Sequence, residues 1–139
     1  MRRAQVDKFI NDYCADNGIK LLIDPSISKN DGCCYVDLKE INLSQKYSSA
    51  SVKLAVFLHE VAHIKVERFK SQPYNRFECE YYSWFEAMKL HKKLFGRAFS
   101  KSQAEFMLKC LKTYCRSHYE FRKTAHEKDA AEKKEKEEA

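Results

Sequence analysis

The spacing of apolar residues along the chain predicts helices before and after a short region of strands. The first pattern covers residues 3–17 and repeats every three to four positions, as it does on one face of a helix. Its apolar members are Val6, Phe9, Ile10, Tyr13 and Cys14. Gly18 follows them, and glycine is the residue that most often ends a helix. We therefore predict a helix that ends at residue 17.

Three short apolar runs follow this helix and predict strands. Residues 19–24 form the first run, which Pro25 ends. Asn30, Asp31 and Gly32 favour a turn in the polar segment that comes next. Residues 33–38 and 41–43 then form two further runs, which we expect to pair antiparallel. The first third of the chain thus predicts one helix and a small three-stranded sheet.

The pattern returns to helical spacing after Ser48 and Ser49, which are candidate N-caps. The helix that they begin is expected to reach about Lys70 and is apolar around most of its circumference, as a central helix is. Asn75 and Glu78 resemble a capping box for the next helix, which should end near residue 95, before Gly96.

Ser100 and Gln103 form another capping box, which predicts a last helix over residues 101–123. No large apolar residue follows Phe121, so residues 124–139 are expected to be a charged, flexible tail. A chain of 139 residues suits one domain, which we place at residues 1–123. The expected fold class is α+β, mainly helical, with the small sheet near the N-terminus.

The central helix carries the most informative residues of the chain, His59, Glu60 and His63. Positions i and i+4 lie on one face of a helix, so the two imidazoles can bind one metal ion. Glu60 lies about 100° away around the axis, where it can take a proton from a metal-activated water. The pattern therefore predicts a zinc-dependent hydrolase with Glu60 as the catalytic base. Two buried histidines without a metal are the structural alternative.

A catalytic zinc site needs a third protein ligand and one open position. A third histidine six residues after His63 is absent, because Phe69 stands there. The ligand must then come from the next helix, whose candidates are Glu78, Glu80, Glu86 and His91.

The chain resembles the ImmA/IrrE-type metallopeptidases, which are small HExxH proteins. The resemblance rests on residues 41–43, on LAVFLHEVAH at residues 54–63, and on residues 78–85. It implies a zincin-like domain, Zn²⁺ as the cofactor and Glu80 as the third ligand, with Glu78 as the alternative. Tyr81 stands where that family has an alanine.

The resemblance also implies an endopeptidase that cleaves a specific regulatory protein, such as a transcriptional repressor, often one encoded on a mobile element. Tyr81, Tyr82 and Tyr74 are candidate donors to the oxyanion or to the substrate, although each also suits ordinary packing. Residues 41–43 directly precede the motif helix and are the expected edge strand for an extended substrate.

Charge and cysteine content limit the other possibilities. The net charge of +6 is spread along the helices, so nucleic acid is an unlikely partner. An SprT-like protease associated with nucleic acid is one alternative, and a non-catalytic metal-bound scaffold that binds a partner protein is another. The six cysteines lack metal or redox spacing, and no segment suits a membrane. We expect reduced thiols and a cytoplasmic protein.

Overall fold

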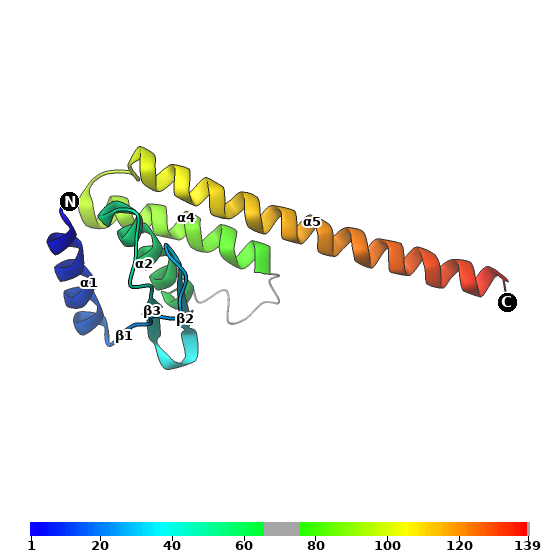
Figure 1. The fold of residues 1–139 in the computed structure, drawn as a ribbon, viewed down its shortest axis with the longest axis horizontal. Coiled ribbons are helices and arrows are strands. Elements are labelled where there is room, and N and C mark those ends of the chain that lie inside the picture. Colours follow the sequence, from blue (N-terminus) through cyan, green and yellow to red (C-terminus); the bar gives the residue numbers. More distant parts are fainter. Residues whose placement is uncertain (66–75, 139) are drawn as a thin grey trace.

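The computed structural model describes residues 1–65 and 76–138, and within the second range the side chains of residues 77–115 and 127–137. Its helices are α1 (Arg3–Asn17), α2 (Ala50–Lys65), α4 (Arg76–Phe95) and α5 (Lys101–Glu138), and its strands are β1 (Lys20–Ile23), β2 (Gly32–Tyr35) and β3 (Glu40–Leu43). Figure 1 shows the small sheet beside α2, with α4 and α5 running across the other side. The predicted α+β, mainly helical class is confirmed.

The sheet has the order β1-β3-β2, with β3 parallel to β1 and antiparallel to β2. The antiparallel pairing of the second and third strands is therefore confirmed. The strand predicted over residues 33–38 is too long, because Val36–Leu38 form a 3₁₀ turn. Lys39 closes this turn with a φ of 48°, and the chain then enters β3.

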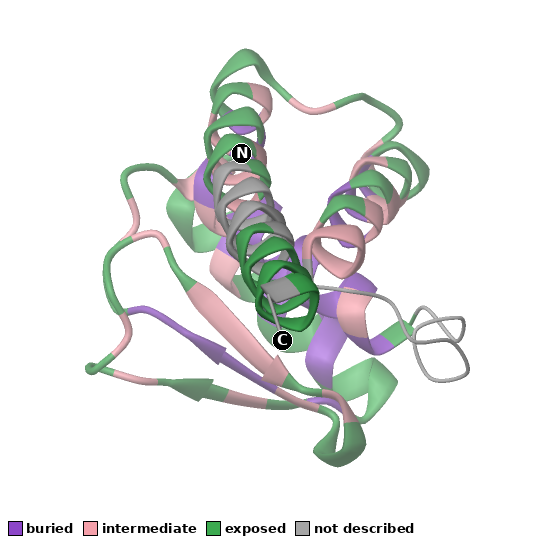
Figure 2. Ribbon diagram, turned by 90° about the vertical axis from the view of Figure 1, so that its right-hand side faces the viewer, coloured by how far each residue is buried: buried purple, intermediate pink, exposed green. Residues whose placement is uncertain are grey.

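Helix α2 is the central helix, as its apolar sequence predicts. Eleven of its residues are buried, and they face α1, α4 and the sheet. The Oγ atom of Ser49 accepts a hydrogen bond from the backbone N–H of Val52, at 3.1 Å, so Ser49 is the N-cap. Figure 2 shows buried residues gathered between the sheet and the helices. The predicted extension to Lys70 and the capping residue Asn75 lie outside the described residues.

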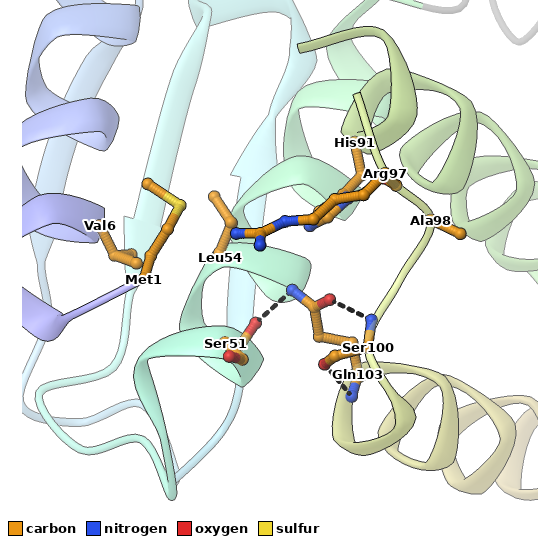
Figure 3. Close-up of a pocket in the computed structure, with 9 residues that line it drawn as sticks. All are labelled: Met1, Val6, Ser51, Leu54, His91, Arg97, Ala98, Ser100 and Gln103. Atoms are coloured by element: carbon orange, nitrogen blue, oxygen red, sulfur yellow. Dashed lines mark hydrogen bonds between the residues drawn. The ribbon is translucent and has the colours of Figure 1, made fainter. Parts of the chain in front are cut away.

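The connection from α4 to α5 is tied to the start of α2. Gly96 has a φ of 71°, which lets the chain leave α4 in a left-handed turn. The predicted capping box forms, because the Ser100 N–H donates to Oε1 of Gln103 at 2.7 Å. The Gln103 amide donates in turn to the carbonyl of Ser51, beside a cavity of about 180 Å³ that Arg97 crosses (Figure 3).

Helix α5 extends well past residue 123, where the apolar pattern stops. It reaches Glu138, and its residues 127–137 are all exposed. Figure 1 shows this part projecting away from the other elements. None of the described helices has the length and apolar content to cross a bilayer.

Candidate metal centre

His59 and His63 lie one turn apart on α2 and point toward the same place. Their Nε2 atoms are 3.2 Å apart, and the two rings meet edge to face. When neither Nε2 atom carries a proton, both present lone pairs to the same place and can bind one cation together. The helical spacing of the two residues therefore does bring both imidazoles to one point.

Helix α4 packs beside α2 and supplies the third group, Glu80. Its Oε2 atom lies 2.7 Å from Nε2 of His59, and its Oε1 atom lies 3.4 Å from Nε2 of His63. His59, His63 and Glu80 form one cluster whose candidate ligand atoms lie within 4.8 Å of one another. In the part of the chain that the structure describes, Glu78 does not belong to such a cluster, and Glu86 pairs with Lys89.

The donor set, two imidazoles and one carboxylate, is compatible with zinc. Tetrahedral ligands at about 2.0–2.1 Å from zinc lie about 3.3 Å from one another. The distances of 3.2 Å between the two Nε2 atoms and 3.4 Å from His63 Nε2 to Glu80 Oε1 are close to that value. The 2.7 Å between His59 Nε2 and Glu80 Oε2 is a hydrogen-bond distance and would lengthen around an ion. Two imidazoles and one carboxylate are also a ligand set of catalytic zinc sites, which keep a fourth position open.

Two further residues of α4 hold the imidazoles in place. Ser83 is fully buried, and its Oγ atom lies 2.9 Å from Nδ1 of His63. Trp84 stacks on His59, with the ring centroids 4.2 Å apart and the planes at 23°. An Nδ1–H bond to Ser83 would leave the Nε2 lone pair of His63 free for a metal. The Nδ1 atom of His59 has no such partner among the described residues.

The centre is electrostatically coupled. Burial raises the pKa of the Glu80 carboxyl, but hydrogen bonds with His59 and His63 outweigh this effect and hold the pKa far below its usual range. Burial lowers the pKa of His63, but its hydrogen bond with Glu80 and the charges of Glu80 and Glu60 raise it overall. Glu80 therefore stays a carboxylate, which is the form that binds a metal.

Glu60 faces the same cavity as His63 and Glu80. This cavity has a volume of about 400 Å³, and β2, α2, α4 and α5 all contribute to its lining. Glu60 is only 6% exposed, and burial raises the pKa of its carboxyl despite the two nearby imidazoles. The thiol of Cys34, on β2, is its hydrogen-bond partner. Glu60 thus stands beside the cluster without belonging to it.

Tyr81 and Tyr82, two of the predicted tyrosines, do not line this cavity. Tyr81 is 47% exposed and packs against Phe77 and Tyr82. Tyr74 lies outside the described residues. The cavity instead includes Tyr114 of α5.

The other sequence candidate, His91, contacts residues that do not belong to this cluster. It is buried, and its Nδ1 donates to the carbonyl of Arg97, at 2.8 Å. It also lines the smaller cavity of Figure 3. His91 thus stabilises the connection between α4 and α5, in which Arg97 lies.

Comparisons with known proteins leave the family of the chain open. No family model matches it, and no curated protein or solved structure shows significant similarity.

Proposed function

We propose that the protein is a zinc-dependent endopeptidase of the ImmA/IrrE type. The observation that carries the proposal is the meeting of His59, His63 and Glu80 at one point, with Glu60 beside them in an open cavity. A structural site would be closed by a fourth protein ligand, whereas among the described residues this cluster has three groups, with a cavity at its side.

The chemistry divides between the metal and Glu60. A zinc ion held by His59, His63 and Glu80 supplies Lewis acidity, which makes water a nucleophile near neutral pH. Glu60 is the general base, and its carboxylate takes the proton of the attacking water and passes it to the amine that leaves. Burial of Glu60 supports this role, because a raised pKa makes a carboxylate a better base.

The outer edge of β2, with which no described strand pairs, is the best place for an extended substrate. The expectation that residues 41–43 form this edge is wrong, because β3 is the central strand and both of its sides are paired. β2 is an edge strand, and Gly32, Cys33 and Cys34 line the cavity. We infer that a flexible segment of a protein pairs with β2 by main-chain hydrogen bonds. A regulatory protein such as a repressor, in the cytoplasm, is the proposed substrate.

The test combines metal content with peptidase activity. We expect one zinc ion per chain in the wild type and a strong loss of zinc in His63→Ala and Glu80→Gln. Glu78→Gln is the matched control, because Glu78 lies on the same helix outside the cluster, and it should keep zinc. If Glu80→Gln keeps zinc as tightly as Glu78→Gln does, the ligand assignment is wrong.

Activity is then measured on unfolded proteins and on a library of extended peptides. Glu60→Gln should keep zinc but lose at least about 100-fold in rate, the lower range for general-base catalysis. Equal rates for Glu60→Gln and the wild type would exclude Glu60 as the base. A protein that binds zinc fully but cleaves nothing would favour the non-catalytic scaffold.

A further inference from the structure

Strand β1 forms the second edge of the sheet, and no described element pairs with its outer side. Figure 2 shows this strand along the outer margin of the sheet, mostly in the colour of exposed residues. Leu22 is 41% exposed and Ile23 is 49% exposed. Proline, charge and a covering loop usually protect such an edge. β1 has one charged residue, Lys20 at its start, and its other three residues have neither proline nor charge. An exposed, apolar edge of this kind is a template for another strand.

The backbone of β1 is oriented for such pairing. Lys20 N–H donates to the carbonyl of Lys39, at 2.8 Å, and Asp24 N–H donates to that of Leu43, at 2.9 Å. Backbone groups alternate in direction along a strand, so Lys20, Leu22 and Asp24 face β3. The N–H and C=O groups of Leu21 and Ile23 must then face away from the sheet.

The sequence of β1 is complementary to itself when it is read in the opposite direction. If Leu22 lies opposite Leu22 of the partner subunit, Leu21 meets the partner's Ile23 and Lys20 meets the partner's Asp24. The outward-facing groups of Leu21 and Ile23 are then the ones that exchange hydrogen bonds in an antiparallel ladder. Lys20 and Asp24 place opposite charges across from each other at both ends of the pairing.

We propose that a second copy of this chain pairs with β1 antiparallel, about a two-fold axis through Leu22. The result is a continuous six-stranded sheet of order β2-β3-β1-β1-β3-β2. The Lys20 side chain is 67% exposed and so can reach the partner, although its Nζ atom lies 3.6 Å from Glu40. The contact is isologous, as two-fold dimers require.

The proposed interface is small, so the dimer should be weak. Four backbone hydrogen bonds and a few apolar side chains form an interface at the low end of known sizes, where association is transient. We expect a dissociation constant between about 10 μM and about 1 mM, as is typical of small interfaces.

Sedimentation of the full chain, from about 10 μM to about 1 mM, tests the association. The wild type should shift from monomer to dimer in this range. Leu22→Lys sets two ammonium groups opposite each other and should weaken the dimer at least about tenfold. A wild type that stays monomeric at the highest concentration would overturn the proposal. A dimer that Leu22→Lys leaves unchanged would do the same.

Cross-linking tests the register. Cβ atoms of directly opposed residues on antiparallel strands are close enough for a disulfide, so Leu22→Cys should cross-link to its own copy under mild oxidation. Leu38→Cys is the matched control, because Leu38 is 70% exposed but lies outside β1. The six native cysteines are common to both variants and set the background. Equal cross-linking of Leu22→Cys and Leu38→Cys would overturn the register.

Discussion

Replacing Ser83 by alanine should weaken metal binding without touching a metal ligand. The Ser83 hydroxyl lies 2.9 Å from Nδ1 of His63, and the residue is fully buried. Alanine removes the oxygen that orients the imidazole and keeps the helix, because alanine is the best helix former. Water cannot easily take the place of the lost oxygen in a buried position.

The size of the effect follows from the role of the lost contact. Removing the hydrogen-bond partner of a metal-binding histidine typically lowers affinity by about 10-fold to about 100-fold. That loss corresponds to about 1.4 to 2.7 kcal/mol of binding free energy. Ser44→Ala is the control, because it removes the hydroxyl of another buried serine, which bonds to the carbonyl of Ile27 away from the centre. It should lower stability but not zinc affinity.

The single tryptophan makes the measurement direct. Trp84 stacks on His59, so its fluorescence should respond to zinc in a titration against a competing chelator. The affinity of Ser83→Ala should fall by the stated factor, and that of Ser44→Ala should equal that of the wild type. If both variants bind zinc as tightly as the wild type does, Ser83 does not orient His63 and the assigned role is wrong.

Three further predictions follow from the packing. Gly32→Ala should lower the free energy of unfolding by about 1–3 kcal/mol, because a Cβ there would lie 3.0 Å from Cγ1 of Val56. A denaturant melt measures this change, and an unchanged midpoint would show that the side chain of Val56 moves aside without cost. Removal of the residues after position 123 should change that free energy by less than about 1 kcal/mol, because residues 127–137 are exposed, whereas a larger loss would mean that the tail docks. Burial raises the pKa of the Cys14 thiol to about 11, so about one molecule in a thousand carries the thiolate at pH 8. In mass-spectrometric labelling at that pH, the exposed Cys115 should therefore react well before Cys14, and equal rates would contradict the burial.

The local features of the fold could be predicted because neighbouring residues determine them. The helix ends at Gly18 and Gly96 and the caps at Ser49 and Ser100 depend on side chains within a few positions, and all four occur where the sequence predicts them. The 3₁₀ turn at residues 36–38 was missed, because a short apolar run suits a strand and a turn equally well.

In the candidate site too, some residues could be predicted from local spacing, whereas others depend on how distant elements pack. The spacing of His59 and His63 alone predicts that both imidazoles lie on one face. Ser83 was missed but is three residues after Glu80 on the same helix, so a search for second partners at that spacing would find it. Cys34 and Tyr114 come from other elements, and their place in the cavity depends on how β2 and α5 pack against α2, which no local pattern records.

The order of the strands separates the two proposed surfaces and leads to a last prediction. β2 borders the cavity and β1 forms the opposite edge, with β3 between them, so a partner on β1 leaves the substrate edge open. Activity per chain should therefore be the same below and above the concentration at which the dimer forms, and Leu22→Lys should have the wild-type rate. The measurement is initial rate against enzyme concentration, with Glu60→Gln as the inactive reference. A rate per chain that rises or falls with dimerisation would mean that pairing at β1 changes the cavity through β3, and the two edges would then not be independent.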